Sequence, residues 1–275
     1  MPEGDTIARA ARALHRALAG EAIKRFESVF PHLNRVRDDR PLAGRTVERV
    51  HAAGKHLLMD FTGDLTLRTH MRMHGSWHLY RPGERWRLRP GRMRILVATG
   101  RAEAVAFDVH DAEMIRTSAL AASLRLRSLG PDLAGPVFDR EEALRRVRGA
   151  RHGTLAELLL DQRVMAGAGN VLKSEVLFLS GLDPFRLAAS LTERERQTLV
   201  DQARRALAVN LLEGPGPVSR SVAAGRRTTD SDDPSARLFV YRRAGRPCRR
   251  CGAAIRSRRH GAHARVTYWC PRCQA

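Results

Sequence analysis

The chain contains 275 residues, of which 43% are hydrophobic, and it carries a formal net charge of +20. This length usually makes two domains, and the charge predicts a polyanionic partner, with nucleic acid the first candidate and a membrane surface the second. There is no apolar run of the ~20 residues that a membrane span needs and no signal-peptide layout, so we expect a cytoplasmic protein without a membrane partner.

The chain begins with Met-Pro-Glu-Gly-Asp-Thr. A small second residue favours removal of Met1, which would place the secondary amine of Pro2 at the start of the mature chain. An α-amino group has a reference pKa of roughly 7.7–8.0, so part of it is neutral and nucleophilic near neutral pH. Such an amine can attack an electrophilic carbon and form an iminium, and Glu3 could pass protons beside it. The alternative is that these residues only begin a helix.

A helix is predicted after Asp5 or Thr6, because apolar residues recur at helical spacing up to Leu18 and Gly20 ends the pattern. From about residue 21, short β-type runs alternate with turn residues, which predicts an antiparallel sandwich or barrel. These runs lie at 46–50, 56–61, 65–69, 76–80, 94–98 and 104–108.

Residues 117–136 contain Gly-Pro signals that predict an interdomain link. The Gly-Pro-Gly-Pro run at 214–217 ends the helical region that follows, and residues 218–236 are polar and rich in Gly, Ser and Asp, which predicts a mobile segment. Helices are predicted at 140–147, 154–160, 171–180 and 192–212.

The four cysteines form a C-x2-C-x18-C-x2-C pattern at Cys248, Cys251, Cys270 and Cys273. This spacing is typical of a zinc ribbon, in which four thiolates close the coordination shell of one structural Zn²⁺. A redox pair, or a mixed shell that includes His260 or His263, is the alternative. The residues between the two cysteine pairs are rich in arginine, which suits phosphate contact or a solvated basic face. These arginines are Arg256, Arg258, Arg259 and Arg265.

Four motifs occur in order: the terminal Pro-Glu-Gly, a Gly-Lys inside a predicted hairpin, Met-Ala-Gly-Ala-Gly-Asn, and the four-cysteine ribbon. Together they make the chain similar to the formamidopyrimidine-DNA glycosylase/endonuclease VIII family, and Pro-Glu-Gly resembles the endonuclease VIII branch. The resemblance implies an α+β fold: an N-terminal antiparallel β-sandwich with flanking helices, a helix–two-turn–helix domain and a zinc ribbon. The expected domains are 1–125, 126–236 and 237–275.

The resemblance also implies roles for single residues. Pro2 would be the nucleophile that forms a Schiff base at C1′, and Glu3 would move protons on the opened sugar. Lys55 matches the hairpin lysine that contacts phosphate and assists base departure or β-elimination. Arg265 matches the ribbon arginine that grips phosphates beside the lesion, and Asn170 matches a phosphate-contacting residue.

The segment His-Met-Arg-Met-His-Gly at 70–75 matches the loop that fills the gap left by an extruded base. Extrusion costs a few kcal/mol of stacking and pairing, which an inserted side chain offsets. Met73 is the candidate wedge, with Arg72 beside the orphaned base and His70 among the DNA contacts. The alternative for Met73 is a core-facing strand residue.

Three other polar residues, Asp108, His110 and Glu175, are expected to have helix-surface or salt-bridge roles. The implied function is a bifunctional DNA glycosylase/AP lyase of base excision repair. It would remove oxidised bases, with pyrimidines as the expected class, and nick the strand by β,δ-elimination. The expected partner is damaged double-stranded DNA, bound by a monomer in the bacterial cytoplasm at the nucleoid. Two alternatives remain: a non-catalytic zinc-ribbon protein that binds damaged DNA, and a glycosylase of the formamidopyrimidine/8-oxoguanine type.

Overall fold

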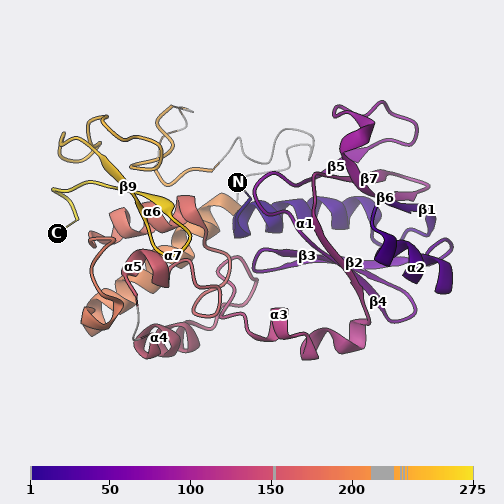
Figure 1. Cartoon of the computed structure of the whole chain (residues 1–275), viewed down its shortest axis with the longest axis horizontal. Coiled ribbons are helices and arrows are strands. Elements are labelled where there is room, and N and C mark those ends of the chain that lie inside the picture. Colours follow the sequence, from indigo (N-terminus) through magenta and orange to yellow (C-terminus); the bar gives the residue numbers. More distant parts are fainter. Residues whose placement is uncertain are drawn as a thin grey trace. The chain divides into compact units, whose positions relative to one another are not determined.

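The computed structural model describes residues 2–150, 153–211, 226–229, 231, 233 and 235–274. They form two compact units, unit 1 up to Arg127 and unit 2 from Ser128 onward (Figure 1). Much of the segment predicted to be mobile, including residues 218–225, lies outside the described residues. Among the described helices, none combines the length and the apolar character that crossing a bilayer requires.

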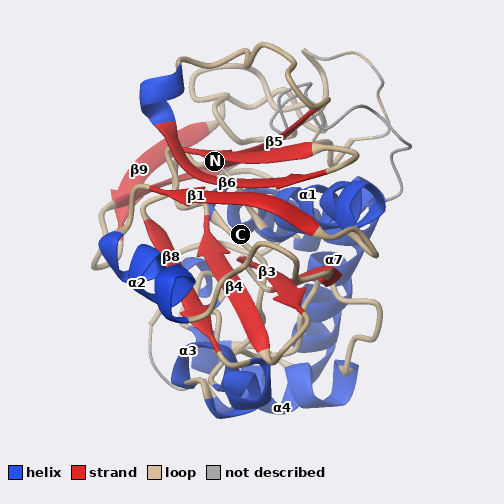
Figure 2. Cartoon of the chain, turned by 90° about the vertical axis from the view of Figure 1, so that its right-hand side faces the viewer, coloured by secondary structure: helices blue, strands red, loops and turns tan. Residues whose placement is uncertain are grey.

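Unit 1 contains two four-stranded antiparallel sheets, so the predicted sandwich is confirmed (Figure 2). The first sheet has the order β1-β6-β7-β5 and the second has the order β2-β3-β4-β8. The strands are β1 (Ile23–Ser28), β2 (Val47–Ala53), β3 (His56–Phe61), β4 (Leu65–His70), β5 (Ser76–Tyr80), β6 (Met93–Thr99), β7 (Glu103–Phe107) and β8 (Asp111–Ile115).

Neighbouring side chains on a strand point to opposite faces of its sheet. In β6, alternate side chains pack into two different hydrophobic clusters, one on each face of the sheet. Ile95 and Val97 pack into the main core of unit 1, whereas Leu96 and Ala98 belong to a smaller cluster on the other face. The first sheet is therefore apolar on both faces, and an additional segment of chain must cover its outer face.

Helix α1 (Gly4–Leu18) forms as predicted, because its apolar residues fall on one stripe that is buried in the main core. Helix α2 (Pro31–Asp39) was not predicted; it begins with proline at its first turn, a position that proline favours, and buries only Leu33. Shorter helical turns in unit 1 are η1 (Pro90–Arg92), η2 (Thr117–Ala122) and α3 (Leu124–Arg127).

Unit 2 combines helices with a C-terminal β-hairpin, as expected. Helix α6 is its centre, because nearly all of its side chains are buried, and it packs against both α7 and the second hairpin strand. Helix α6 ends at Gly181, whose φ of +69° is the left-handed conformation that glycine adopts at such ends. The elements are α4 (Arg140–Gly149), α5 (Leu155–Leu158), α6 (Asn170–Ser180), η3 (Ala188–Ser190), α7 (Glu193–Leu211), β9 (Arg256–His260) and β10 (Arg265–Trp269).

Candidate functional site

The start of the chain is held by α1. Pro2 is half-buried and directly precedes Glu3, the N-cap residue of α1. The Glu3 side chain is fully buried, and its carbonyl accepts a hydrogen bond from Ile7 N at 3.0 Å. Because α1 is fixed in the main core by its apolar stripe, the proline and the buried carboxylate have a rigid support.

Lys55 lies in the two-residue loop between β2 and β3, where Ala53 pairs with His56. Gly54, the first residue of this loop, has a φ of +57°, a conformation that glycine adopts without strain. The Lys55 side chain is half-buried. The predicted hairpin lysine is therefore present, presented by a tight turn between two strands of the second sheet.

Two histidines lie beside this loop. His56 and His70 face each other across β3 and β4, with their ring centroids 5.0 Å apart. The pKa of His70 is lowered from its usual 6.5 to about 4, mainly by burial; within this net shift the charge of Asp111 raises the pKa and that of Lys55 lowers it. Burial also lowers the pKa of His56 to about 3. Both imidazoles are consequently neutral at pH 7.

The tautomer of His70 is fixed by the loop that follows it. The backbone N–H of Arg72 donates a hydrogen bond to His70 Nδ1 at 3.1 Å. An accepting Nδ1 in a neutral imidazole leaves the proton on Nε2. His70 therefore offers an uncharged N–H donor, which suits a phosphate oxygen.

The loop after β4 separates two methionines. Met71 is buried, whereas Met73 is 50% exposed and is one of the few large apolar side chains that reach solvent. The turn closes through a 2.8 Å hydrogen bond from Gly75 N to Met71 O, and a Cβ on Gly75 would lie only 2.6 Å from that oxygen. The alternative that Met73 faces the core is wrong, since Met71 takes that place.

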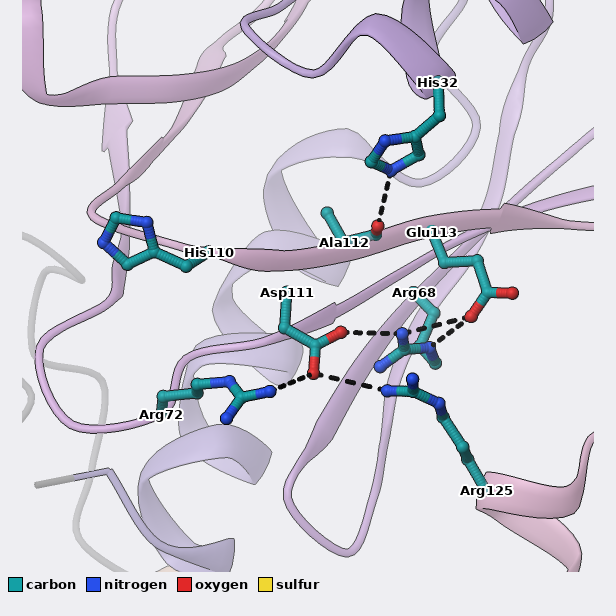
Figure 3. A pocket seen from close by; sticks show the side chains of 8 residues that line it. All are labelled: His32, Arg68, Arg72, His110, Asp111, Ala112, Glu113 and Arg125. Atoms are coloured by element: carbon teal, nitrogen blue, oxygen red, sulfur yellow. Dashed lines mark hydrogen bonds and ion pairs between the residues drawn. The ribbon is translucent and has the colours of Figure 1, made fainter.

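A cavity of about 330 Å³ adjoins this loop in unit 1 (Figure 3). Its floor is the buried Arg68, which donates to Asp111 at 2.8 Å and to Glu113 at 3.1 Å. Asp111 also pairs with Arg72 at 3.2 Å and with Arg125 at 3.4 Å. The positive φ of Arg72, +49°, turns its side chain toward this carboxylate. Arg68 and Asp111 were not predicted from the sequence, in which the only signal is an arginine inside an otherwise apolar and Thr-rich strand.

In unit 2, α6 holds the ribbon hairpin at the strand that begins with Arg265. Asn170 donates through Nδ2 to Val266 O at 3.0 Å. The buried Lys173 donates to Thr267 Oγ1 at 2.7 Å and also reaches Val266 O at 3.3 Å. Arg265 itself is half-buried at the start of β10. Asn170 and Arg265 are thus linked through one strand, and Lys173, one of only three lysines in the chain, was overlooked.

Glu175 does not lie on a helix surface, contrary to the prediction. It is fully buried, and its carboxylate accepts hydrogen bonds from Thr228 Oγ1 and from three consecutive backbone N–H groups. These N–H groups belong to Phe239, Val240 and Tyr241, at 2.8–2.9 Å. Glu175 therefore fixes the chain that leads into the ribbon.

The two other polar residues lie in unit 1. Asp108 forms an ion pair with Arg92, as predicted. His110 is exposed and lines the cavity of Figure 3.

The four cysteine Sγ atoms all lie within 4.8 Å of one another. Cys248 and Cys273 are 3.9 Å apart, and Cys251 and Cys270 are 3.5 Å apart. A tetrahedral zinc with Zn–S bonds of about 2.3 Å places its sulfurs about 3.8 Å apart, so the cluster fits that ion. His260 lies outside the cluster, because its Nε2 is hydrogen-bonded to Thr154 Oγ1 at 2.8 Å.

One of the hairpin arginines has a packing role. The guanidinium of Arg258 lies 3.5 Å from the centroid of the Phe185 ring, within unit 2. This contact is a cation–π interaction that fixes β9 against the helical part of the unit. Arg256 and Arg259 are exposed.

Comparison with known proteins covers the whole chain. Family models match residues 1–114 (formamidopyrimidine-DNA glycosylase N-terminal domain), 129–220 (formamidopyrimidine-DNA glycosylase H2TH domain) and 245–275 (zinc finger found in FPG and IleRS). A probable endonuclease 8 2 of Streptomyces coelicolor is 41% identical over 100% of this chain and 94% of its own length. The DNA-(apurinic or apyrimidinic site) lyase Nei2 of Mycolicibacterium smegmatis is 36% identical over 100% of this chain and 99% of its own length. A crystal structure of Lactococcus lactis Fpg with abasic-site DNA has a TM-score of 0.82 at 23% identity, covering 99% of both chains, and supports the fold.

Proposed function

Because the chain belongs to the formamidopyrimidine-DNA glycosylase/endonuclease VIII family, it is a DNA glycosylase with AP lyase activity in base excision repair, and we propose that it removes oxidised pyrimidines through Pro2. The observation that carries the proposal is the position of Pro2 next to the fully buried Glu3 at the start of a helix fixed in the core. The preference for pyrimidines rests on the resemblance of the Pro-Glu-Gly start to the endonuclease VIII branch, and relatives named endonuclease 8 support that branch.

In the proposed reaction, the neutral Pro2 nitrogen attacks C1′ of the damaged nucleoside, the base leaves with the electron pair of its bond and takes up a proton, and the Pro2 nitrogen loses its own proton. The sugar ring opens as the C1′–O4′ bond breaks and O4′ takes up a proton, which leaves an iminium between the proline nitrogen and C1′. A carboxylate beside this centre can supply and remove protons, and Glu3 is the group in that position.

The iminium acidifies the protons on C2′. Loss of one of them expels the 3′ phosphate by β-elimination, and a second elimination expels the 5′ phosphate. The charges of Lys55 and Arg265 are proposed to stabilise the departing phosphates, because cations aimed at developing negative charge lower the barrier. Each step uses only groups of the chain and of the DNA.

His70, Arg72 and Met73 are proposed to hold the duplex open. His70 would donate its Nε2–H to a phosphate, and the exposed Met73 would enter the gap left by the extruded nucleotide. Arg72 lies on the same loop, with its guanidinium already oriented by Asp111. Asn170 would contribute a phosphate contact from unit 2.

One structural Zn²⁺ is proposed to be held by Cys248, Cys251, Cys270 and Cys273. Four thiolates leave the ion no open position, so it would maintain the ribbon and take no part in the chemistry. The ribbon would in turn present Arg265.

The test is trapping with borohydride on duplexes that contain defined lesions. Reduction of the iminium should link the protein covalently to duplexes with oxidised pyrimidines, and a variant with a short N-terminal extension, which blocks the Pro2 amine, should not be linked. Equal trapping of the extended variant would show that Pro2 is not the nucleophile. Binding of damaged DNA without trapping or cleavage would favour a non-catalytic binder, and preferential trapping on 8-oxoguanine would assign the other substrate class.

A further inference from the structure

The connection between β5 and β6 is unusually basic. Residues 81–94 contain six arginines and a single acidic residue, Glu84. We call residues 81–92 the arginine strap; the structure describes all of them. None of the positions assigned to lesion processing lies in the strap. The arginines of this stretch are Arg81, Arg85, Arg87, Arg89, Arg92 and Arg94.

The middle of the strap alternates between two environments. Trp86 and Leu88 pack on the outer face of the first sheet, where they cover the small apolar cluster around Phe107. The residues between and beside them, Arg85, Arg87 and Arg89, are exposed. The strap therefore buries its apolar side chains and presents a row of three guanidinium groups to solvent.

Specific contacts fix this arrangement. Trp86 Nε1 donates to Glu103 Oε2 at 3.2 Å, and the Trp86 ring meets Phe107 edge to face with centroids 5.8 Å apart. The backbone N–H of Arg87 donates to the Tyr80 hydroxyl at 3.2 Å. A side-chain row on such a support loses less entropy on binding than the same arginines on an unsupported loop.

The acidic groups near the strap are already engaged. The Glu84 carboxylate accepts from the backbone N–H of Arg81 at 2.9 Å, and Glu103 accepts from Trp86 and from Arg25. Asp108 pairs with Arg92. Two of these carboxylates, Glu103 and Asp108, are thus ion-paired with arginines outside the row, Arg25 and Arg92.

The strap lies on the opposite face of the sheet from α1. The apolar stripe of α1 packs into the main core with Ile95 and Val97, whereas the strap covers the cluster that contains Leu96 and Ala98. Figure 1 shows the strap beyond β5, β6 and β7, on the side of these strands away from α1. DNA bound only at the Pro2 end of α1 would therefore not need the strap.

We propose that the arginine strap is a second DNA-binding surface of unit 1, which contacts backbone phosphates of duplex outside the lesion. A DNA strand carries one phosphate per about 3.4 Å of helix axis, so its backbone offers several acceptors to a row of three guanidinium groups. Guanidinium groups bind phosphate through paired hydrogen bonds.

A nucleic acid fits this surface better than a protein partner does. The strap turns Trp86 and Leu88 inward, and none of its residues is among the exposed large apolar side chains of the described chain. Protein interfaces usually have an apolar centre, whereas phosphate contacts need only cations and hydrogen-bond donors. Binding through such contacts is independent of base sequence and depends steeply on salt.

The test compares full-length variants on two duplexes. Arg85, Arg87 and Arg89 are replaced together by glutamine in one variant and by lysine in a second, which keeps the charge. The matched control replaces three exposed arginines of unit 2 by glutamine: Arg145, Arg148 and Arg194. Binding is measured against salt on a duplex of about six helical turns and on a lesion duplex of about one and a half turns.

On the long duplex, the glutamine variant of the strap should show a slope of log affinity against log salt that is shallower by about two to three, since each lost phosphate contact removes about 0.9. The lysine variant and the unit 2 control should keep the wild-type slope. Cleavage of the short lesion duplex under single-turnover conditions should be unchanged in all three variants.

An unchanged slope on the long duplex in the glutamine variant would overturn the proposal, and so would an equal loss of slope in the unit 2 control. Binding of a polyglutamate peptide that is lost in the same variant, without any change in DNA binding, would assign the strap to an acidic protein. The proposal rests on the proposed function only in taking DNA as the partner. Failure of the wild-type protein to cleave the short duplex would count against Pro2 chemistry and not against the strap.

Discussion

The backbone N–H of Arg72 donates to His70 Nδ1, and this single contact connects the protonation state of a half-buried histidine to the loop that carries Met73. The imidazole can accept this bond only while Nδ1 is unprotonated. Since burial lowers the pKa of His70 to about 4, the contact is intact throughout the physiological pH range. The loop is therefore arranged before DNA arrives.

The two half-buried histidines, His56 and His70, should make stability depend on pH. In the unfolded chain each titrates near 6.5, but the folded-state pKa is about 4 for His70 and about 3 for His56. Between the folded-state and unfolded-state pKa values, the unfolded chain binds more protons than the folded chain. The unfolding free energy therefore falls as pH drops below about 6.5, whereas above this pH the contribution of the two histidines is constant. Denaturant titrations from pH 4 to 8 give the unfolding free energy at each pH. In a His56→Gln variant this free energy should depend less steeply on pH than in the wild type, by up to about 1.4 kcal/mol per pH unit. Parallel curves for variant and wild type would contradict the neutral state of His56.

Glu3→Gln tests the buried carboxylate. The amide keeps the shape of the side chain but cannot exchange protons, so single-turnover base excision should fall by roughly 10²–10⁴-fold. Affinity for damaged duplex should stay close to that of the wild type, because the amide has nearly the same size as the carboxylate and the phosphate-binding cations are unchanged. Equal losses of affinity and rate would point to a structural role for Glu3.

Met73 and Met71 form a matched pair on one loop. Met73→Ala should leave the unfolding free energy nearly unchanged, because its side chain is half exposed, and should lower excision from duplex more than from single-stranded substrate. Met71→Ala should cost about 2–5 kcal/mol of stability, since it opens a cavity in the main core. Equal effects of Met73→Ala on the two substrates would exclude a wedge.

The bond between Lys173 and Thr267 should couple α6 to the ribbon. Lys173→Met leaves the Thr267 hydroxyl and the Val266 carbonyl without this donor, at a cost of about 1–3 kcal/mol. Adding Thr267→Val should recover part of that loss, and a double-mutant cycle in denaturant measures the coupling. Strict additivity of the two substitutions would show that the contact contributes nothing.

Removal of zinc should affect the ribbon selectively. Chelation takes away the ion that would hold four thiolates together, so residues 245–275 should unfold and DNA binding should be lost, whereas the sandwich should remain folded. Hydrogen exchange before and after chelation, with a DNA-binding assay in parallel, checks both parts. Unchanged affinity after complete removal of the metal would contradict the role given to the ribbon.

Local patterns in the sequence predicted much of the architecture. The strand predictions at 56–61 and 76–80 coincide with β3 and β5, and the periodic stripe from Ile7 to Leu18 became α1. The spacing of the cysteines alone predicted a single cluster, and the four sulfurs do lie together. These features follow from residues close together in the chain, whose periodicity and turn chemistry are visible without a structure.

Only the tertiary structure revealed the groups that hold the candidate site residues in place. Arg68 meets Asp111 across 43 positions of sequence, Lys173 meets Thr267 across 94, and Glu175 meets Val240 across 65. Burying such charges is unfavourable unless partners are supplied, and those partners come from distant strands and helices that the fold brings together. Sequence thus predicted which chemistry the chain carries, whereas the long-range pairing of buried polar groups decided how the Arg72 side chain and the ribbon strand that begins with Arg265 are held.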